Sequence, residues 1–337
     1  MLGLLKKVAD WQLAQPAPTN RPSMDDWTYG TLYAGMMALS RVSDVPAYHD
    51  AMMAMAQRHH WKPAKRPYDA DDYCISQTYL ELYARHHAPA MLAPTQARLD
   101  YILANPRANS LDFKQKNARD RWWWCDALFM SPPVWSRLSA VTGDPKYLDF
   151  MDREWRATAA FLYDTNEHLF FRDSTYFEQR EANGRKVFWS RGNGWVMAGL
   201  VRVLETMPPR DPRRAFYERR FTEMAERIAS LQTSDGLWHS SLLDPESYPS
   251  KETSGSSFHA YALAWGIHHG LLKRARYEPV VRRAWAALQE CVSPEGKLQF
   301  VQPVGTTPKT FDPTHSDVFG VGAFLLAGSE IYSGLLR

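Results

Sequence analysis

The sequence predicts an all-α protein, an (α/α)6 barrel in which six buried helices form an inner ring and six amphipathic helices surround them. Two observations lead to this prediction. Six segments rich in apolar and small residues recur with starts roughly 45 to 70 residues apart, an internal period typical of repeat architectures. Between them lie segments with apolar residues at spacings of three and four and charged residues opposite, the pattern of surface helices.

The buried segments begin with polar, glycine or serine residues and continue as nearly unbroken apolar runs. A helix that is apolar on all sides must be surrounded by other elements. Pro132 and Pro133 are expected to break or kink the third segment. The six segments are Tyr29 to Val42, Asp72 to Ala84, Asp126 to Val141, Gly194 to Met207, Ser257 to Leu272 and Val318 to Leu335.

The amphipathic segments carry start signals in which proline stands at or near the first helical position, such as Asp144-Pro145, Asp211-Pro212 and Ala93-Pro94. Alternation of the two types packs most economically as a toroid, a single domain over residues 1–337. The outer segments are Met1 to Gln15, Tyr48 to His60, Pro94 to Asn105, Pro145 to Tyr163, Pro212 to Gln232 and Tyr277 to Val292.

Composition and charge exclude several classes of protein. The 337 residues are 45% hydrophobic, so a large core can form, and the net charge of +3 comes from interleaved charges, which argues against nucleic acid as a partner. Three distant cysteines without a CxxC pair argue against disulfides and structural zinc and fit a reducing compartment. The N-terminus reads as an amphipathic helix and not as a signal peptide. No run approaches the roughly 18 apolar residues of a membrane span, so we expect a cytoplasmic protein.

Unusual polar and aromatic residues gather at the starts of the inner helices. Because these helices run in the same direction, their N-terminal ends should open on one mouth and line one pocket. Helix capping explains some of the aspartates and serines. Capping does not explain three tryptophans before Asp126, or the run from Trp189 to Trp195, Trp-Ser-Arg-Gly-Asn-Gly-Trp.

Asp126 is the strongest candidate for a catalytic acid. It follows Trp122 to Trp124 and precedes an apolar run, so burial should raise its pKa and let it hold a proton near neutral pH. A helix N-terminus opposes this shift, and the sequence does not say which effect is larger. Asp71 or Asp72 would supply a second carboxyl group, since most glycoside hydrolases use two.

Arg191 lies between tryptophans and glycines, a setting suited to a bidentate clamp on a carboxylate. Trp189 or Trp195 could stack on a sugar ring. The adjacent histidine pairs lack the spacing of a helical metal site, so no metal is expected, and no phosphate-binding or dinucleotide-binding motif is present.

The motifs together identify a family. DADDYCISQTYLELY, WWWCDALFMSPP, FWSRGNGWVMAGL and ETSGSSFHAYALAWGI resemble the unsaturated rhamnogalacturonyl hydrolases and, more distantly, the unsaturated glucuronyl hydrolases, over nearly the whole chain. The resemblance implies an (α/α)6 fold without metal or cofactor, acting on a small oligosaccharide made by a polysaccharide lyase. It implies that Asp126 protonates C4 of the unsaturated uronate, that water adds at C5, and that no covalent enzyme intermediate forms.

The resemblance also implies a second aspartate, Asp71 or Asp72, and places Trp189 and Arg191 in the substrate-binding segment. In some relatives a histidine follows the strip that here reads His168 to Asp173, so Arg172 is a departure that bears on sugar preference. The further candidates for substrate contact, taken from their positions at the expected mouth, are Trp27, Trp124, Asn193, Ser256 and His259.

Other functions remain open from the sequence alone. The substrate can be an unsaturated glucuronide, the toroid can be a silent sugar binder, and His259 with His315 keeps a sugar epimerase possible. The oligomeric state is not predicted. A structure should bring Trp27, Asp72, Asp126, Trp189, Arg191 and Ser256 around one cavity.

Overall fold

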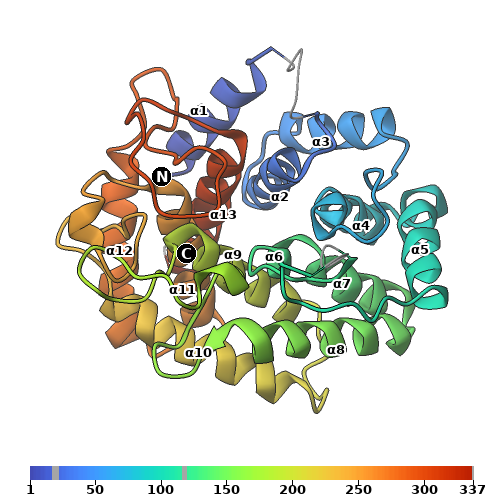
Figure 1. The fold of residues 1–337 in the computed structure, drawn as a ribbon. Coiled ribbons are helices and arrows are strands. Elements are labelled where there is room, and N and C mark those ends of the chain that lie inside the picture. The colour runs from blue at the N-terminus through green and yellow to red at the C-terminus, as the bar shows by residue number, and fades with distance from the viewer. Residues whose placement is uncertain (17–22, 116–119, 336–337) are drawn as a thin grey trace.

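The inner ring of the predicted barrel is present. A computed structural model describes residues 1–16, 23–115 and 120–335. Figure 1 shows the inner helices around the centre with the others outside them. The inner helices are α2 (Trp27–Val42), α4 (Ser76–His86), α6 (Ala127–Met130) continued by α7 (Pro132–Thr142), α9 (Ser190–Leu204), α11 (Thr253–His268) and α13 (Val318–Leu335).

The outer ring carries the charged faces that the sequence pattern requires. Each outer helix packs on an inner helix, and α1 precedes the first inner helix, α2. The outer helices are α1 (Leu2–Leu13), α3 (Ala47–Arg58), α5 (Pro89–Ala104), α8 (Pro145–Leu162), α10 (Arg214–Ser230) and α12 (Arg274–Gln289).

The ring closes between its first and last inner helices, since α13 packs on both α2 and α11. Glycine allows this closure. A Cβ added to Gly35 would lie 2.7 Å from the Cα of Gly322, so the two helix backbones approach as closely as only glycine permits.

Some helix boundaries differ from the prediction, and one predicted break is confirmed. Pro94 was expected to open the third outer helix, but Pro89 occupies the first turn and Pro94 lies inside α5, where it removes one backbone hydrogen bond. The tenth helix begins at Arg214 and not at Pro212. The break at Pro132 and Pro133 is confirmed, because Ser131 separates α6 from α7.

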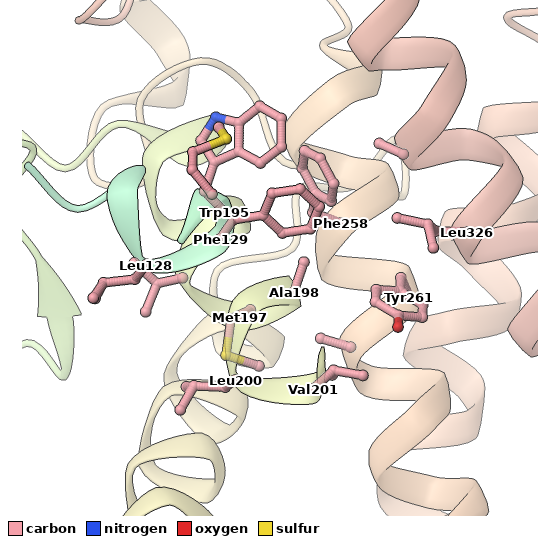
Figure 2. Close-up of a cluster of buried hydrophobic side chains, with 14 of the residues drawn as sticks. Leu128, Phe129, Trp195, Met197, Ala198, Leu200, Val201, Phe258, Tyr261 and Leu326 are labelled. Atoms are coloured by element: carbon pink, nitrogen blue, oxygen red, sulfur yellow. The ribbon is translucent and has the colours of Figure 1, made fainter. Parts of the chain in front are cut away.

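Aromatic and aliphatic side chains fill the inside of the ring below its mouth (Figure 2). Trp195 of α9 lies 4.9 Å from Phe129 and 4.3 Å from Phe258, centroid to centroid, which joins three inner helices. Two short strands, β1 (Tyr163–Asp164) and β2 (Leu169–Phe170), form an antiparallel hairpin after α8. A 3-10 turn, η1 (Ala70–Tyr73), leads into α4 and contacts α6.

Helix α13 corrects one expectation. Its 18 residues have a mean hydropathy of 1.4, so by length and composition this helix is apolar enough to cross a membrane. It is 67% buried in the ring, between α2 and α11, and this packing accounts for its apolar character.

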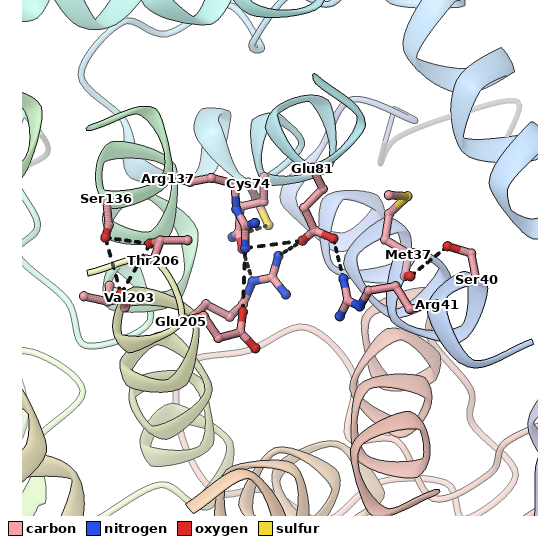
Figure 3. A network of polar contacts seen from close by, with 12 residues as sticks. Met37, Ser40, Arg41, Cys74, Glu81, Ser136, Arg137, Val203, Glu205 and Thr206 are labelled. Atoms are coloured by element: carbon pink, nitrogen blue, oxygen red, sulfur yellow. Dashed lines mark hydrogen bonds and ion pairs between the residues drawn. The ribbon is translucent and has the colours of Figure 1, made fainter. Parts of the chain in front are cut away.

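At the end of the ring away from the mouth, charged side chains take the place of apolar ones (Figure 3). Glu81 of α4 receives hydrogen bonds from Arg41 of α2 at 2.7 Å and from Arg202 of α9. Arg137 of α7 lies 3.7 Å from Glu81 and 3.6 Å from Glu205. This buried network ties four inner helices together.

Candidate active site

Two adjoining cavities open at the mouth formed by the inner N-termini. The inner cavity has a volume of about 200 Å³ and the outer cavity about 910 Å³. Trp27, Asp71 and Val304 line both, so the two form one continuous cleft. The other residues of the inner cavity are Trp124, Asp126, Met130, Arg172, Trp189, Arg191, Trp195, Gly305 and Thr306.

Asp126 lies just before α6 and is 8% exposed. Burial is the largest influence on its carboxyl group and raises the pKa, while Arg172 and Arg191 act in the opposite direction. The Cys125 thiol donates a hydrogen bond to Asp126 Oδ2 at 3.5 Å. Desolvation therefore outweighs the nearby positive charges of the two arginines in setting the direction of this pKa shift.

The two neighbouring aspartates of η1 have different surroundings. Asp71 lines both cavities, and burial, followed by the charges of Asp69 and Asp126, raises the pKa of its carboxyl group well above the usual value. Asp72 is bound by Arg66, whose Nε lies 3.0 Å and Nη2 2.5 Å from Asp72 Oδ1. The backbone N–H of Arg66 donates to the other oxygen. Asp71 is thus the carboxyl group that faces Asp126, and Asp72 fixes a loop of the outer cavity.

Arg172 stands beside Asp126 in the inner cavity. Its Nε lies 3.6 Å from Asp126 Oδ2, and its Nη1 donates to Asp173 at 2.7 Å. The backbone holds it there, because Cys125 N–H donates to the Arg172 carbonyl at 2.8 Å. Arg172 is therefore a positive charge on the cavity wall within reach of an anionic ligand.

Arg191 lines the inner cavity, but the two terminal nitrogens of its guanidinium already bond other groups. The clamp hypothesis requires them to be free to bind a carboxylate. Nη2 donates to the Pro303 carbonyl at 2.8 Å, and Nη1 donates to the Gln302 carbonyl. The group also stacks on Trp189, 4.5 Å from the ring centroid. Arg191 thus anchors the loop that carries the far wall of the cavity, and Arg172 is better placed to meet a carboxylate.

The predicted tryptophans lie in the cavity. Trp27, Trp124 and Trp189 all line it, and Trp189 Nε1 donates to Gln302 Oε1 at 2.9 Å, which fixes its ring. Indole faces of this kind stack on sugar rings.

Three predicted contact residues do not line either cavity in the described part of the chain. Asn193 holds the hairpin by bonding both backbone groups of Phe170, at 2.8 and 3.1 Å. Ser256 Oγ bonds the Trp238 backbone. His259 is fully buried, and burial lowers its pKa to about 3. These residues support the wall from behind. Of the six residues predicted to surround one cavity, five line the continuous cleft, Asp72 in its outer part only, and Ser256 does not.

The sequence reasoning missed Met130 and the loop at Val304 to Thr306. Nothing in the loop's composition marks it as part of a site. Its role follows from the three-dimensional contacts of Arg191 and Trp189, which sequence spacing does not reveal.

One metal-type arrangement lies far from this site. His268, His269 and Glu330 bring ligand atoms within 4.8 Å of one another at the C-terminal ends of α11 and α13, opposite the mouth. Within this group His268 Nδ1 lies 2.8 Å from Glu330 Oε1.

An (α/α)6 barrel whose mouth holds two carboxyl groups of raised pKa, a guanidinium and several indole rings defines a carbohydrate-active enzyme. The sequence matches the family described as Glycosyl Hydrolase Family 88 over residues 4–335. The chain belongs to that family and is a glycosidase, which confirms the resemblance seen in the motifs and sets aside a silent sugar binder or an epimerase.

Relatives of known name and structure agree with this assignment. The chain is 40% identical to an unsaturated 3S-rhamnoglycuronyl hydrolase of Formosa agariphila, over 96% of this chain and 88% of that protein. It is 34% identical to a protein of the same name from Alteromonas sp. (strain LOR), over 97% and 84%. The structure of a glycosyl hydrolase family 88 protein from Bacteroides vulgatus superposes with a TM-score of 0.90 at 30% identity, covering 99% and 98%.

Proposed function

We propose that this glycosidase releases a 4,5-unsaturated uronate from the non-reducing end of lyase-generated oligosaccharides, where the neighbouring sugar is rhamnose. The observation that carries this proposal is the pair Asp71 and Asp126 in one small cavity beside Arg172. Two carboxyl groups of raised pKa can hold a proton near neutral pH, and the guanidinium suits the carboxylate of a uronate. The names of the two relatives support rhamnose as the leaving sugar.

In this proposal Asp126 donates its proton to C4 of the double bond, and positive charge develops at C5 beside the ring oxygen. Water then adds at C5 and gives a proton to Asp71. The resulting hemiketal rearranges and expels the neighbouring sugar, and proton transfer within the pair restores the starting state. Two interacting carboxyl groups that share one proton are suited to this exchange.

Substrate binding helps to place that proton on Asp126. The charge of Arg172 lowers the pKa of Asp126. A uronate carboxylate bound to Arg172 neutralises this charge, so the Asp126 pKa rises further when substrate is present. Bound substrate thereby increases the fraction of Asp126 that is protonated.

The identity of the parent uronate matters less than that of the leaving sugar. Glucuronate and galacturonate differ only at C4, and the lyase makes this carbon planar, so both give the same unsaturated ring. Discrimination between pectin-type and other lyase products must then come from the linkage and from the leaving sugar, which lies toward the outer cavity.

Two leaving sugars are candidates. Plain rhamnose, as in pectin-derived rhamnogalacturonan, is favoured by charge, because the outer cavity is lined by Asp25, Asp26, Asp71 and Asp72 against Lys65 and Arg66. Arg66 is already paired with Asp72. Rhamnose with a 3-sulfate is favoured by the names of the two relatives.

The test is direct. The enzyme is incubated with disaccharides of the unsaturated uronate bonded to rhamnose, to 3-sulfated rhamnose and to a hexose, and loss of the double-bond absorbance is followed. In heavy water the product should carry one deuterium at C4. Stable absorbance with all three substrates, from a folded enzyme, would refute the proposal.

A further inference from the structure

The neck between the two cavities carries an exposed apolar side chain. Trp27, Asp71 and Val304 line both cavities, so a sugar bonded to a ring in the inner cavity must pass these three residues. Val304 is 57% exposed, more than any other large hydrophobic side chain in residues 1–16, 23–115 and 120–335. Apolar surface left open at this point of a binding cleft is available to a ligand.

The surroundings of Val304 are otherwise polar. Among the residues of the outer cavity only Trp27, Ala64 and Val304 are apolar, and the rest carry carboxylate, hydroxyl or cationic groups. Sugar hydroxyls suit the polar walls. An apolar substituent at the neck would find Val304 and Trp27.

The backbone on both sides of Val304 is fixed. Arg191 bonds the carbonyls of Gln302 and Pro303, as described above, and Gln302 Nε2 donates to the Thr307 carbonyl at 2.8 Å. The Tyr176 hydroxyl donates to Thr306 Oγ1 at 3.3 Å. A side chain held on a segment with this many anchors can distinguish substrates that differ by one atom.

We propose that Val304, with Trp27, contacts the C6 methyl group of a 6-deoxyhexose leaving sugar and so selects rhamnose over hexoses with a hydroxymethyl group. This inference rests on the proposed function. A hydroxymethyl group placed against Val304 would lose water without gaining a hydrogen-bond partner, whereas a methyl group loses no hydrogen bond. The buried guanidinium of Arg191 thereby acts on specificity through the loop that it anchors.

The experiment compares two disaccharides in which the unsaturated uronate is bonded to L-rhamnose or to L-mannose, which differ by one hydroxyl group on C6. The wild-type enzyme should have the higher kcat/KM for the rhamnose compound. Val304→Thr keeps the shape but exchanges a methyl for a hydroxyl group, and should reduce this preference about fourfold, the effect of one buried CH2 group, mainly through KM.

Two further variants control the result. Val45→Thr makes the same exchange beyond the C-terminal end of α2, away from the mouth, and should leave the preference unchanged. Val304→Ala keeps the side chain apolar and should retain more of the preference than Val304→Thr.

The outcomes separate the two proposals. If the wild type hydrolyses both disaccharides equally, or if Val304→Thr keeps the wild-type ratio, the inference about Val304 is overturned while the proposed function stands. If the folded wild-type enzyme acts on no unsaturated uronate disaccharide, the proposed function falls and the inference falls with it. A reduced ratio in Val304→Thr with an unchanged ratio in Val45→Thr supports the inference.

Discussion

Both ends of the inner ring bury carboxyl groups beside arginines, yet the two ends treat them in opposite ways. At the rear, Glu81 accepts hydrogen bonds from Arg41 and Arg202, and the three arginines around it lower its pKa to about 2 although burial acts against them. At the mouth, burial raises the pKa of Asp126 despite Arg172 and Arg191. The same kinds of side chain hold a carboxylate as an anion at one end and raise the pKa of a carboxyl group at the other.

The number and closeness of the arginine charges, followed by direct hydrogen bonding, explain the difference in pKa. The Glu81 carboxylate is bonded by guanidinium groups, which favour the charged form. The nearest cation to Asp126 is Arg172 at 3.6 Å, and the Nη1 and Nη2 atoms of Arg191 donate hydrogen bonds to carbonyl groups of the loop. A buried carboxyl group can retain its proton when the arginines near it form their hydrogen bonds with other groups.

The strongest test of this comparison is Asp126→Asn, which keeps the size of the side chain but cannot protonate C4. We expect kcat to fall on the order of a hundredfold or more, within the range of about 10²–10⁴ that general acids contribute. Turnover of the unsaturated disaccharide and circular dichroism provide the measurements.

Stability should move differently from activity in this variant. Because the folded-state pKa of Asp126 is raised, the ionised carboxyl group destabilises the fold above that pKa, and its removal should leave the melting temperature unchanged or higher. A folded variant with near-normal kcat would remove Asp126 from the mechanism.

Glu81→Gln should show the reverse pattern. It leaves Arg202 buried without its counter-ion, so the free energy of unfolding should fall by about 3–5 kcal/mol, while kcat of the folded protein stays near the wild-type value. Asp44→Asn, at the exposed pair with Lys6, is the control and should barely change the melting temperature.

The pH dependence of stability gives a second reading of Glu81. Its pKa is depressed from 4.5 to about 2 in the folded state, so its contribution is fully present above pH 4.5 and is lost as the pH falls toward 2. The free energy of unfolding, measured with denaturant between these pH values, should depend less steeply on pH in Glu81→Gln than in the wild type. An unchanged slope would mean that Glu81 is not held as an anion.

Arg172→Gln tests the coupling at the mouth. The acid must be protonated, so kcat/KM falls as the pH rises through the pKa of Asp126. Removal of the positive charge raises that pKa, and the alkaline limb should move to higher pH by on the order of one unit. KM should also rise, because the uronate carboxylate loses its partner.

The matched variant is Arg172→Lys, which keeps the charge and should keep the position of the limb while still raising KM. If the alkaline limb of the kcat/KM profile also stays in place in Arg172→Gln, a group other than Arg172 sets the pKa of the acid.

The elements of the fold with strong local signals could be predicted from the sequence. Val318–Leu335 was predicted with the observed bounds because it is rich in apolar and small residues over its whole length, and Pro132 marked a real interruption. The start of α9 was placed at Gly194 and lies at Ser190. Gly194 serves helix packing and not a loop, since a Cβ there would lie 3.0 Å from Phe258 Cβ. That contact is long-range and invisible in local sequence.

The site residues likewise include some with a local sequence signal and others whose role depends on long-range contacts. Trp27, Trp124, Asp126 and Trp189 were found because unusual residues stood at predicted helix starts, and they do line the cavity. The partners of Arg191 lie more than a hundred residues away, so spacing suggested a clamp where the fold uses an anchor.

The choice between Asp71 and Asp72 extends the comparison to two adjacent residues, and Asp72→Asn carries the smallest expected effect on stability. Asp72 resembles Glu81 in being bonded by an arginine, whereas Asp71 resembles Asp126 in facing the cavity with a raised pKa. Asp72→Asn should therefore lower the free energy of unfolding by about 1–2 kcal/mol, through weaker bonds to a half-exposed Arg66, and leave kcat nearly unchanged. Asp71→Asn should lower kcat strongly and leave the melting temperature close to that of the wild type. Steady-state kinetics and thermal melts of both variants decide the matter, and a larger kcat loss in Asp72→Asn than in Asp71→Asn would reverse the assignment. The contrast is informative because the two side chains share one turn, so only the arginine contact and the cavity distinguish them.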